Sequence, residues 1–280
     1  MAYKYQTIGH FQIGYEEMNA EAQYILFFIH GNSGSCNTWK GQFLDPGLKH
    51  YRMIAFDLPG HGKSSPAIQP TDEYSPIETS KVIAEAVKIL AEDKCYCLIG
   101  FSYGTNIIAE MLNFGLCPKG LAFVGASCLG ADYGIDIAFQ ASKKPSIFFY
   151  NEEDQRVVRA FFKQSISDEA FINLLINDYF NTDKNFRPSL MKAAVNGKIC
   201  DEILAIKKAN RPILLIFGQK DKIVNVDYLD SLPFAVWQDH IYKLPDAGHW
   251  TQFDVTKKLN ELLACFAGEV FTTCHALRQD

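Results

Sequence analysis

The stretch IGFSYGT, Ile99 to Thr105, places a serine between two glycines where one sequence pattern gives way to another. The hydrophobic run CYCLI before it is typical of a buried strand, and the run NIIAEML after it has the spacing of a helix. Glycine is the usual residue where a backbone needs positive φ or a close approach. The spacing of Gly100, Ser102 and Gly104 therefore predicts a sharp strand-to-helix turn that presents the serine in a cleft.

Apolar runs recur along the chain, with helical patterns between them. Runs without polar alternation are typical of central strands in a parallel sheet. The clearest helix signal starts at Ser75, where Pro76 and Glu78 complete a capping box. Strands that alternate with helices predict an α/β fold, with a mainly parallel central sheet and helices on both faces. KYQTI and FQIGYEE predict an antiparallel hairpin at its edge; the central runs are YILFFI, YRMIAFD, CYCLIGF, LAFVGA, PILLIFG and HIYKLPD.

The interval between Ala126 and Pro212 breaks this alternation, because it contains helical patterns and little strand signal. A crossover between parallel strands needs only about a dozen residues. We therefore predict a core formed by residues 1–127 and 201–280, with residues 128–200 inserted as a helical cap or lid. An elaboration of the core is the alternative interpretation of this interval.

Composition narrows the class of protein. The 280 residues are 48% hydrophobic and 21% charged, with a net charge of −5, as in an ordinary soluble domain. No block of basic residues favours nucleic acid, and no apolar run is long enough for membrane insertion. The start MAYKYQTIGH lacks the layout of a signal peptide, and the eight cysteines form no C-x-x-C pair. We expect a cytoplasmic protein, and the sequence indicates no oligomeric state.

Three polar residues follow predicted strands at the ends where parallel sheets bind ligands. Ser102 follows CYCLIGF, Asp221 follows PILLIFG, and His249 follows HIYKLPD. Serine, acid and histidine in this chain order predict a catalytic triad. Asp132, after the LAFVGA strand, is the competing candidate for the acid.

With these motifs the chain resembles the α/β-hydrolase superfamily, and in particular its lidded branch. The resemblance rests on GFSYG together with HGNSGS (His30 to Ser35), DLPGHGKSS (Asp57 to Ser65), the segment around Asp221 and AGH before Trp250. It implies that Ser102 is the nucleophile, His249 the general base and Asp221 the acid that orients the imidazole. It also implies backbone oxyanion donors at Tyr103 and Asn32, with Ser33 as the alternative to Asn32, and neither cofactor nor metal.

The identity of the nucleophile narrows the reaction. Epoxide hydrolases and haloalkane dehalogenases of this superfamily use an aspartate there, so Ser102 favours acyl transfer. We expect a cofactor-free serine hydrolase that cleaves a small, largely apolar acyl substrate: an ester, thioester, lactone or C–C bond next to a ketone. A ligand-binding or receptor protein and an acyltransferase are the alternatives. Some lid aromatics are expected to line the pocket, from the set Phe139, Phe148, Phe149, Tyr150, Phe161, Phe162, Phe171, Tyr179 and Phe180.

Overall fold

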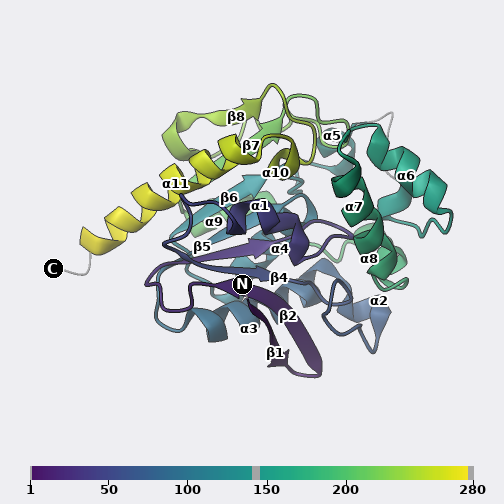
Figure 1. The fold of residues 1–280 in the computed structure, drawn as a ribbon, viewed down its shortest axis with the longest axis horizontal. Helices are drawn as coiled ribbons and strands as arrows, with labels where there is room; N and C mark the ends of the chain where they lie inside the picture. Colours follow the sequence, from purple (N-terminus) through teal and green to yellow (C-terminus); the bar gives the residue numbers. More distant parts are fainter. Residues whose placement is uncertain (1, 141–145, 277–280) are drawn as a thin grey trace.

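A computed structural model describes residues 2–140 and 146–276. Within these residues, eight strands form one sheet in the order β1-β2-β4-β3-β5-β6-β7-β8 (Figure 1). β1 and β2 form an antiparallel hairpin at the edge, and β2 also pairs antiparallel with β4. All remaining neighbours are parallel. The predicted α/β class and the edge hairpin are confirmed.

The elements have the following bounds. The strands are β1 Ala2–Ile8, β2 Phe11–Met18, β3 Ile25–Ile29, β4 Arg52–Phe56, β5 Tyr96–Phe101, β6 Gly120–Val124, β7 Ile213–Gly218 and β8 Ile241–Leu244. The α-helices are α1 Lys40–Phe43, α2 Pro70–Glu73, α3 Pro76–Ala91, α4 Tyr103–Met111, α5 Ile135–Ala138, α6 Gln155–Lys163, α7 Glu169–Asn181, α8 Phe186–Val195, α9 Glu202–Ala209, α10 Thr251–Asp254 and α11 Thr256–Ala276. Short 3₁₀ helices are η1 Cys36–Trp39, η2 Leu112–Phe114, η4 Ser146–Phe148 and η5 Trp237–Asp239.

Two glycines show how helices cover both faces of the sheet. A Cβ on Gly120 of β6 would lie 2.7 Å from Phe266 of α11, and a Cβ on Gly100 of β5 would lie 2.8 Å from Ile108 of α4. Gly120 pairs with Cys97, three residues before Gly100 on the same strand. Because side chains alternate along a strand, Gly100 and Gly120 point to opposite faces. α4 and α11 therefore pack on opposite sides of the sheet.

Four of the six predicted central strands are buried along their whole length, as their apolar sequences predict. Every residue of β3, β5, β6 and β7 is buried. The prediction was wrong for HIYKLPD, which forms β8 at the edge of the sheet, where Ile241, Tyr242 and Lys243 are only partly buried.

The predicted start of α3 is also confirmed in part: Ser75 Oγ accepts from Glu78 N at 3.3 Å, with Pro76 in the first turn. The reciprocal half of the capping box is absent, because Ser75 N donates to Asp72 O instead.

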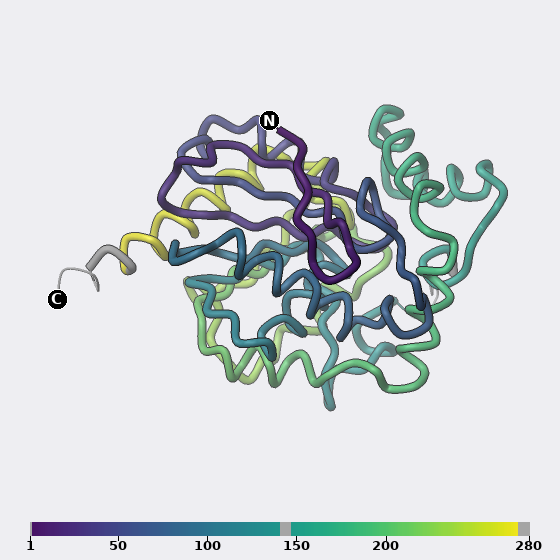
Figure 2. Tube along the Cα trace, turned by 90° about the horizontal axis from the view of Figure 1, so that it is seen from below, coloured from purple at the N-terminus to yellow at the C-terminus, as the bar shows by residue number. Residues whose placement is uncertain are grey.

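The chain between β6 and β7 supplies α5 to α9. β6 and β7 themselves pair directly in parallel register, from Leu121 opposite Ile213 to Val124 opposite Ile216. In Figures 1 and 2, α6, α7 and α8 form a group at one side of the sheet, whereas α9 returns to pack beside α4. Residues 141–145 of the predicted lid lie outside the described residues.

Within the described residues, no helix combines the length and apolarity that a membrane span requires.

Candidate active site

Ser102 stands at a sharp turn between β5 and α4. Its backbone has φ 49° and ψ −122°, a conformation that residues other than glycine rarely adopt. Such backbone strain costs roughly 1–3 kcal/mol and occurs where the surrounding structure enforces it. Here Ser102 N donates to Val124 O on β6, and Ser102 O accepts from Thr105 N in the first turn of α4. The turn therefore fixes the direction of the hydroxyl.

The two flanking glycines serve close packing. A Cβ on Gly104 would lie 2.3 Å from Ile29 O and 2.7 Å from His30 O, both backbone atoms that cannot move aside. A Cβ on Gly100 would lie 2.8 Å from Gly104 O. Of the two uses of glycine expected from the sequence, close approach applies at these positions. Positive φ falls on the serine between them.

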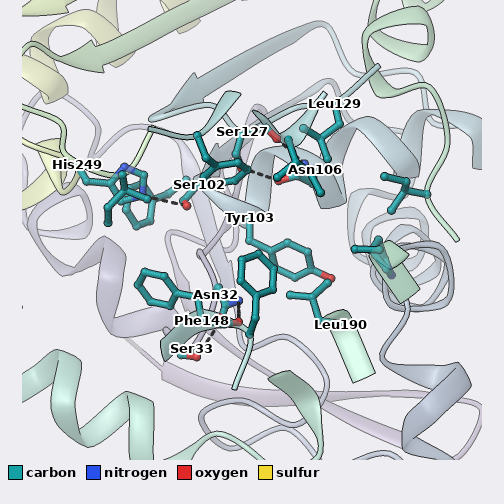
Figure 3. Close-up of a pocket in the computed structure, with 18 of the residues that line it drawn as sticks. Asn32, Ser33, Ser102, Tyr103, Asn106, Ser127, Leu129, Phe148, Leu190 and His249 are labelled. Atoms are coloured by element: carbon teal, nitrogen blue, oxygen red, sulfur yellow. Dashed lines mark hydrogen bonds between the residues drawn. The ribbon is translucent and has the colours of Figure 1, made fainter. Parts of the chain in front are cut away.

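The structure brings Ser102, His249 and Asp221 together. His249 Nε2 lies 3.0 Å from Ser102 Oγ (Figure 3), and His249 Nδ1 lies 2.7 Å from Asp221 Oδ2. His249 and Asp221 are buried, with 2% and 4% of their surfaces exposed. The other oxygen of Asp221 accepts from the N–H groups of Ile223 at 2.7 Å and Val224 at 3.0 Å. In this chain of hydrogen bonds a histidine can take the proton of a serine while a carboxylate holds its tautomer.

Asp132, the competing candidate for the acid, lies elsewhere. It is exposed in the turn after β6, and the partner of His249 Nδ1 is Asp221. The predicted choice of Asp221 over Asp132 is thus the one that the geometry favours.

The candidate oxyanion donors lie at the same end of the sheet as Ser102. Tyr103 is the first residue of α4, so its N–H is among those that a helix leaves without an internal partner. Asn32 and Ser33 both line the pocket. Asn32 Nδ2 donates to Phe148 O at 2.8 Å (Figure 3), and Ser33 Oγ donates to Asn32 Oδ1 at 2.6 Å. The side chain of Asn32 thus connects the loop after β3 to the chain between β6 and β7.

A buried carboxylate holds the two loops that follow β3 and β4. Asp57 accepts from Cys36 N at 2.7 Å, from Lys63 N at 2.9 Å and from the hydroxyl of Tyr3. His30 Nε2 accepts from Leu58 N at 3.0 Å. Asp57 and His30 thus hold the backbone of these two loops.

The pocket beside Ser102 encloses about 950 Å³ of empty space, including the part open to solvent. Its lining is mainly apolar. Among the described lining residues, His249 carries an imidazole and Glu202 a carboxyl group, and none is a lysine or an arginine. From the predicted aromatic set, Phe139, Phe148, Phe149 and Phe162 line it. The others lie elsewhere: for example, Phe171 stacks on Phe253 with ring centroids 4.3 Å apart.

Asp178 of α7 joins the same helical group to the loop after β3. It is 3% exposed and accepts from Ser35 Oγ at 2.7 Å. Burial raises the pKa of the Asp178 carboxyl to about 7, and the nearby Asp57 adds to this, while the hydrogen bond from Ser35 opposes it. Asp178 is therefore a buried acid that ionises near neutral pH.

This pKa predicts a pH-dependent stability. Well below pH 4 the carboxyl is protonated in both the folded and the unfolded state. As pH rises toward 7 the unfolded chain loses the proton first, so the free energy of unfolding falls. Asp178→Asn has no proton to lose and should not show this fall. The free energy of unfolding of the variant minus that of wild type should therefore be roughly 2–4 kcal/mol larger at pH 8 than at pH 4. Urea denaturation of both proteins across this range measures the difference. The exposed Asp132→Asn is the control; equal pH profiles for wild type and Asp178→Asn would contradict the assignment.

Several residues at the site were not predicted from the sequence. Asn106 and Glu202 line the pocket, and Arg187 donates to Ser33 Oγ at 2.9 Å. Asn106 could have been inferred, because it lies four residues after Ser102 and thus one helical turn away. Glu202 and Arg187 carry no comparable local signal. Searched over the part of the chain that the structure describes, no cluster of His, Cys, Asp and Glu side chains could hold a metal ion.

The sequence is similar to proteins of the alpha/beta hydrolase fold and to curated enzymes. The family model described as the alpha/beta hydrolase fold matches residues 24–126. A dihydrolipoyllysine-residue acetyltransferase component of an acetoin cleaving system from Pseudomonas putida is 26% identical over 89% of this chain. The chain spans 65% of that protein, less than two thirds of its length. A 2-hydroxy-6-oxononadienedioate/2-hydroxy-6-oxononatrienedioate hydrolase from Klebsiella pneumoniae is 22% identical, over 86% of each chain.

Solved structures share the fold over nearly the whole chain. N-acyl homoserine lactonase AidH complexed with N-butanoyl homoserine superposes with a TM-score of 0.87, at 24% identity, covering 96% of this chain and 97% of that one. The esterase RhEst1 from Rhodococcus sp. ECU1013 gives a TM-score of 0.76 at 19% identity, covering 96% and 98%.

Proposed function

We propose that this chain is an enzyme of the α/β-hydrolase superfamily, and on that premise a serine hydrolase acting on a small, largely apolar acyl compound. The observation that carries the proposal is the pair of hydrogen bonds from Ser102 Oγ to His249 Nε2, 3.0 Å, and from His249 Nδ1 to Asp221 Oδ2, 2.7 Å. Ser102 and His249 line a mainly apolar pocket, where an acyl chain can bind beside the hydroxyl.

The proposed reaction has two halves. His249 takes the proton of Ser102 as its oxygen bonds to the acyl carbon, and then gives that proton to the leaving group as the acyl bond breaks. Water, deprotonated by His249, next attacks the acyl carbon; the bond to Ser102 Oγ then breaks, His249 returns the proton to Oγ, and the acid is released. Asp221 keeps Nδ1 protonated, so that Nε2 can accept, and stabilises the imidazolium that forms in each half.

Charge that develops on the acyl oxygen needs donors, and we assign them to the backbone N–H groups of Tyr103 and Asn32. Ser33 is the alternative to Asn32, since both line the pocket. Donors fixed in place before the reaction are worth more than donors that must reorganise. The position of Tyr103 at the helix start supports its assignment.

The substrate class is inferred from the pocket wall and from the named relatives. Apolar and aromatic groups around Ser102 favour an apolar acyl chain, and no cationic side chain among the described lining residues would pair with an anionic one. Relatives of comparable size are named as hydrolases, and structures of the same fold as a lactonase and an esterase. The proposal therefore covers an ester, thioester, lactone or C–C bond next to a ketone.

We also propose that residues 128–200 form the lid of this pocket. Four aromatic side chains of this segment line it, and three hydrogen-bonded contacts join the segment to the loop after β3: Asn32 with Phe148, Ser35 with Asp178, and Ser33 with Arg187. Such a lid would supply apolar walls and exclude water.

The cytoplasmic location expected from the sequence remains part of the proposal.

A screen of p-nitrophenyl esters of graded chain length, beside a C–C hydrolase substrate, tests the function. We expect turnover of at least one ester series, with an optimum chain length set by Phe148. Phe148→Ala should move the optimum to longer chains, because each methylene that a pocket accepts changes kcat/KM by roughly 10-fold or more. The backbone acceptor for Asn32 is retained in this variant.

Phe171→Ala is the matched control, since that ring stacks on Phe253 outside the pocket lining. It should leave the optimum unchanged. Saturable binding of the esters without turnover would favour the receptor alternative. Product formation only with an added alcohol or amine would favour the acyltransferase.

A further inference from the structure

A buried carboxyl lies at the wall of the acyl pocket and takes no part in the reaction proposed above. Glu202, the first residue of α9, lines the pocket and is fully buried. Figure 3 shows Ser102 between His249 on one side and Asn106 with Leu129 on the other. Glu202 bonds to both Asn106 and Leu129, so it belongs to the side of the pocket away from His249.

The hydrogen bonds of Glu202 use only one of its oxygens. Oε2 accepts from Asn106 Nδ2 at 2.8 Å and from Leu129 N at 2.6 Å. Asn106 is held in turn by Ser127, which accepts from Nδ2 through its carbonyl at 2.7 Å and donates to Oδ1 through its hydroxyl at 2.6 Å. Glu202 Oε1 has no hydrogen-bond partner among the described residues. The network thus positions the carboxyl and leaves one buried oxygen without a partner.

That oxygen is a donor at neutral pH. Burial raises the pKa of Glu202 to about 8, despite the two N–H groups that oppose the shift. Because both N–H donors point at Oε2, the proton of the neutral acid belongs on Oε1. A buried O–H without an acceptor is costly, and the cost disappears when a ligand supplies an acceptor.

We propose that Glu202 forms a polar subsite in the acyl pocket, where Oε1–H donates to a carbonyl or ether oxygen carried on the acyl chain of the substrate. The subsite rests on the proposed function, because it assumes that an acyl chain from Ser102 enters this pocket. Asn106 lies four residues beyond Ser102 on α4, or about 6 Å along the helix, so the oxygen falls on roughly the fourth to sixth carbon of the chain.

The surrounding wall makes such a subsite selective. Leu129, Leu190, Ala194 and Ile199 line the pocket and offer no side-chain hydrogen bond. An oxygen at the correct position satisfies Glu202, whereas an all-carbon chain leaves the O–H unpaired. A site built to hydrogen-bond a substrate group rejects analogues that lack it.

Binding to the Ser102→Ala protein tests the subsite without turnover. Calorimetry compares matched pairs of methyl esters: 4-oxopentanoate with pentanoate, 5-oxohexanoate with hexanoate, and 6-oxoheptanoate with heptanoate. We expect one oxo ester to bind roughly 3- to 10-fold more tightly than its parent, the gain of one net hydrogen bond. Adding Glu202→Leu should reverse that ratio, because the carbonyl then becomes the unpaired group, while adding Glu202→Gln retains an N–H donor and the preference.

Glu110→Gln is the matched control. Glu110 is a buried carboxyl on the same α4 that accepts from Cys200 N at 2.6 Å and does not line the pocket, so the ratio should persist. A ratio of one or below at every oxo position, or the same ratio after Glu202→Leu, overturns the subsite. If Glu202→Leu does not fold, the subsite is tested by two binding ratios: oxo ester against parent ester in the Ser102→Ala protein, and the same ratio after adding Glu202→Gln. Failure of the wild-type protein to turn over any ester, thioester, lactone or C–C hydrolase substrate would overturn the proposed function instead.

Discussion

Replacing Ser102 by alanine is expected to lower kcat for a short p-nitrophenyl ester by about 10⁴- to 10⁶-fold. The hydroxyl is the atom that would bond to the acyl carbon, and no neighbouring group can substitute for it. The residual rate would come from the pocket and the backbone donors alone. Steady-state kinetics measures the loss, and labelling by a fluorophosphonate probe, which reacts with activated serines, should disappear with it.

The thermal midpoint of Ser102→Ala is the control, because it shows whether the variant is still folded. Alanine can adopt the same strained φ as serine, so the thermal midpoint should change little, and loss of activity would then report on chemistry. Persistent labelling of Ser102→Ala, or labelling of wild type at another serine, would contradict the assignment of the nucleophile.

Asp221→Asn is expected to lower kcat by about 10⁴-fold with the fold intact. The amide oxygen of asparagine can keep the bonds from Ile223 N and Val224 N, which places its NH₂ against His249 Nδ1. The imidazole must then carry its proton on Nε2, where it can no longer accept from Ser102. Kinetics, with circular dichroism to verify folding, measures the effect.

Asp132→Asn is the matched comparison, because it removes the other candidate acid from an exposed position. It should retain wild-type kcat. A mild effect of Asp221→Asn together with a crippling effect of Asp132→Asn would show that the acid belongs to the loop after β6.

The fold was predictable because its signals are local. Uninterrupted apolar runs mark strands covered on both faces, and the structure buries every residue of four of them. The meeting of Ser102, Asp221 and His249 was predictable because each follows a strand at the same edge of a parallel sheet. No pairwise signal between them was needed.

The parts that could not be predicted depend on contacts between distant segments. Glu202 meets Asn106 across 96 positions of the chain, and a glutamate at the start of a helix is commonly exposed. Its burial, and hence its neutral charge, follows only from how α9 packs on α4. The positive φ of Ser102 was equally hidden, because sequence reasoning assigns that conformation to glycine.

The direct pairing of β6 with β7 has a consequence for how this chain can change over evolutionary time. The sheet closes behind the intervening chain, so insertions and deletions in α6 to α8 need not disturb the register of Leu121 with Ile213 or of Val124 with Ile216. α9 does not share this freedom, because it is packed on α4. Phe162 of α6 can therefore be exchanged together with these helices, while Glu202 at the start of α9 stays with the core. On the proposals above, preferences for chain size and for chain polarity then become separately heritable traits.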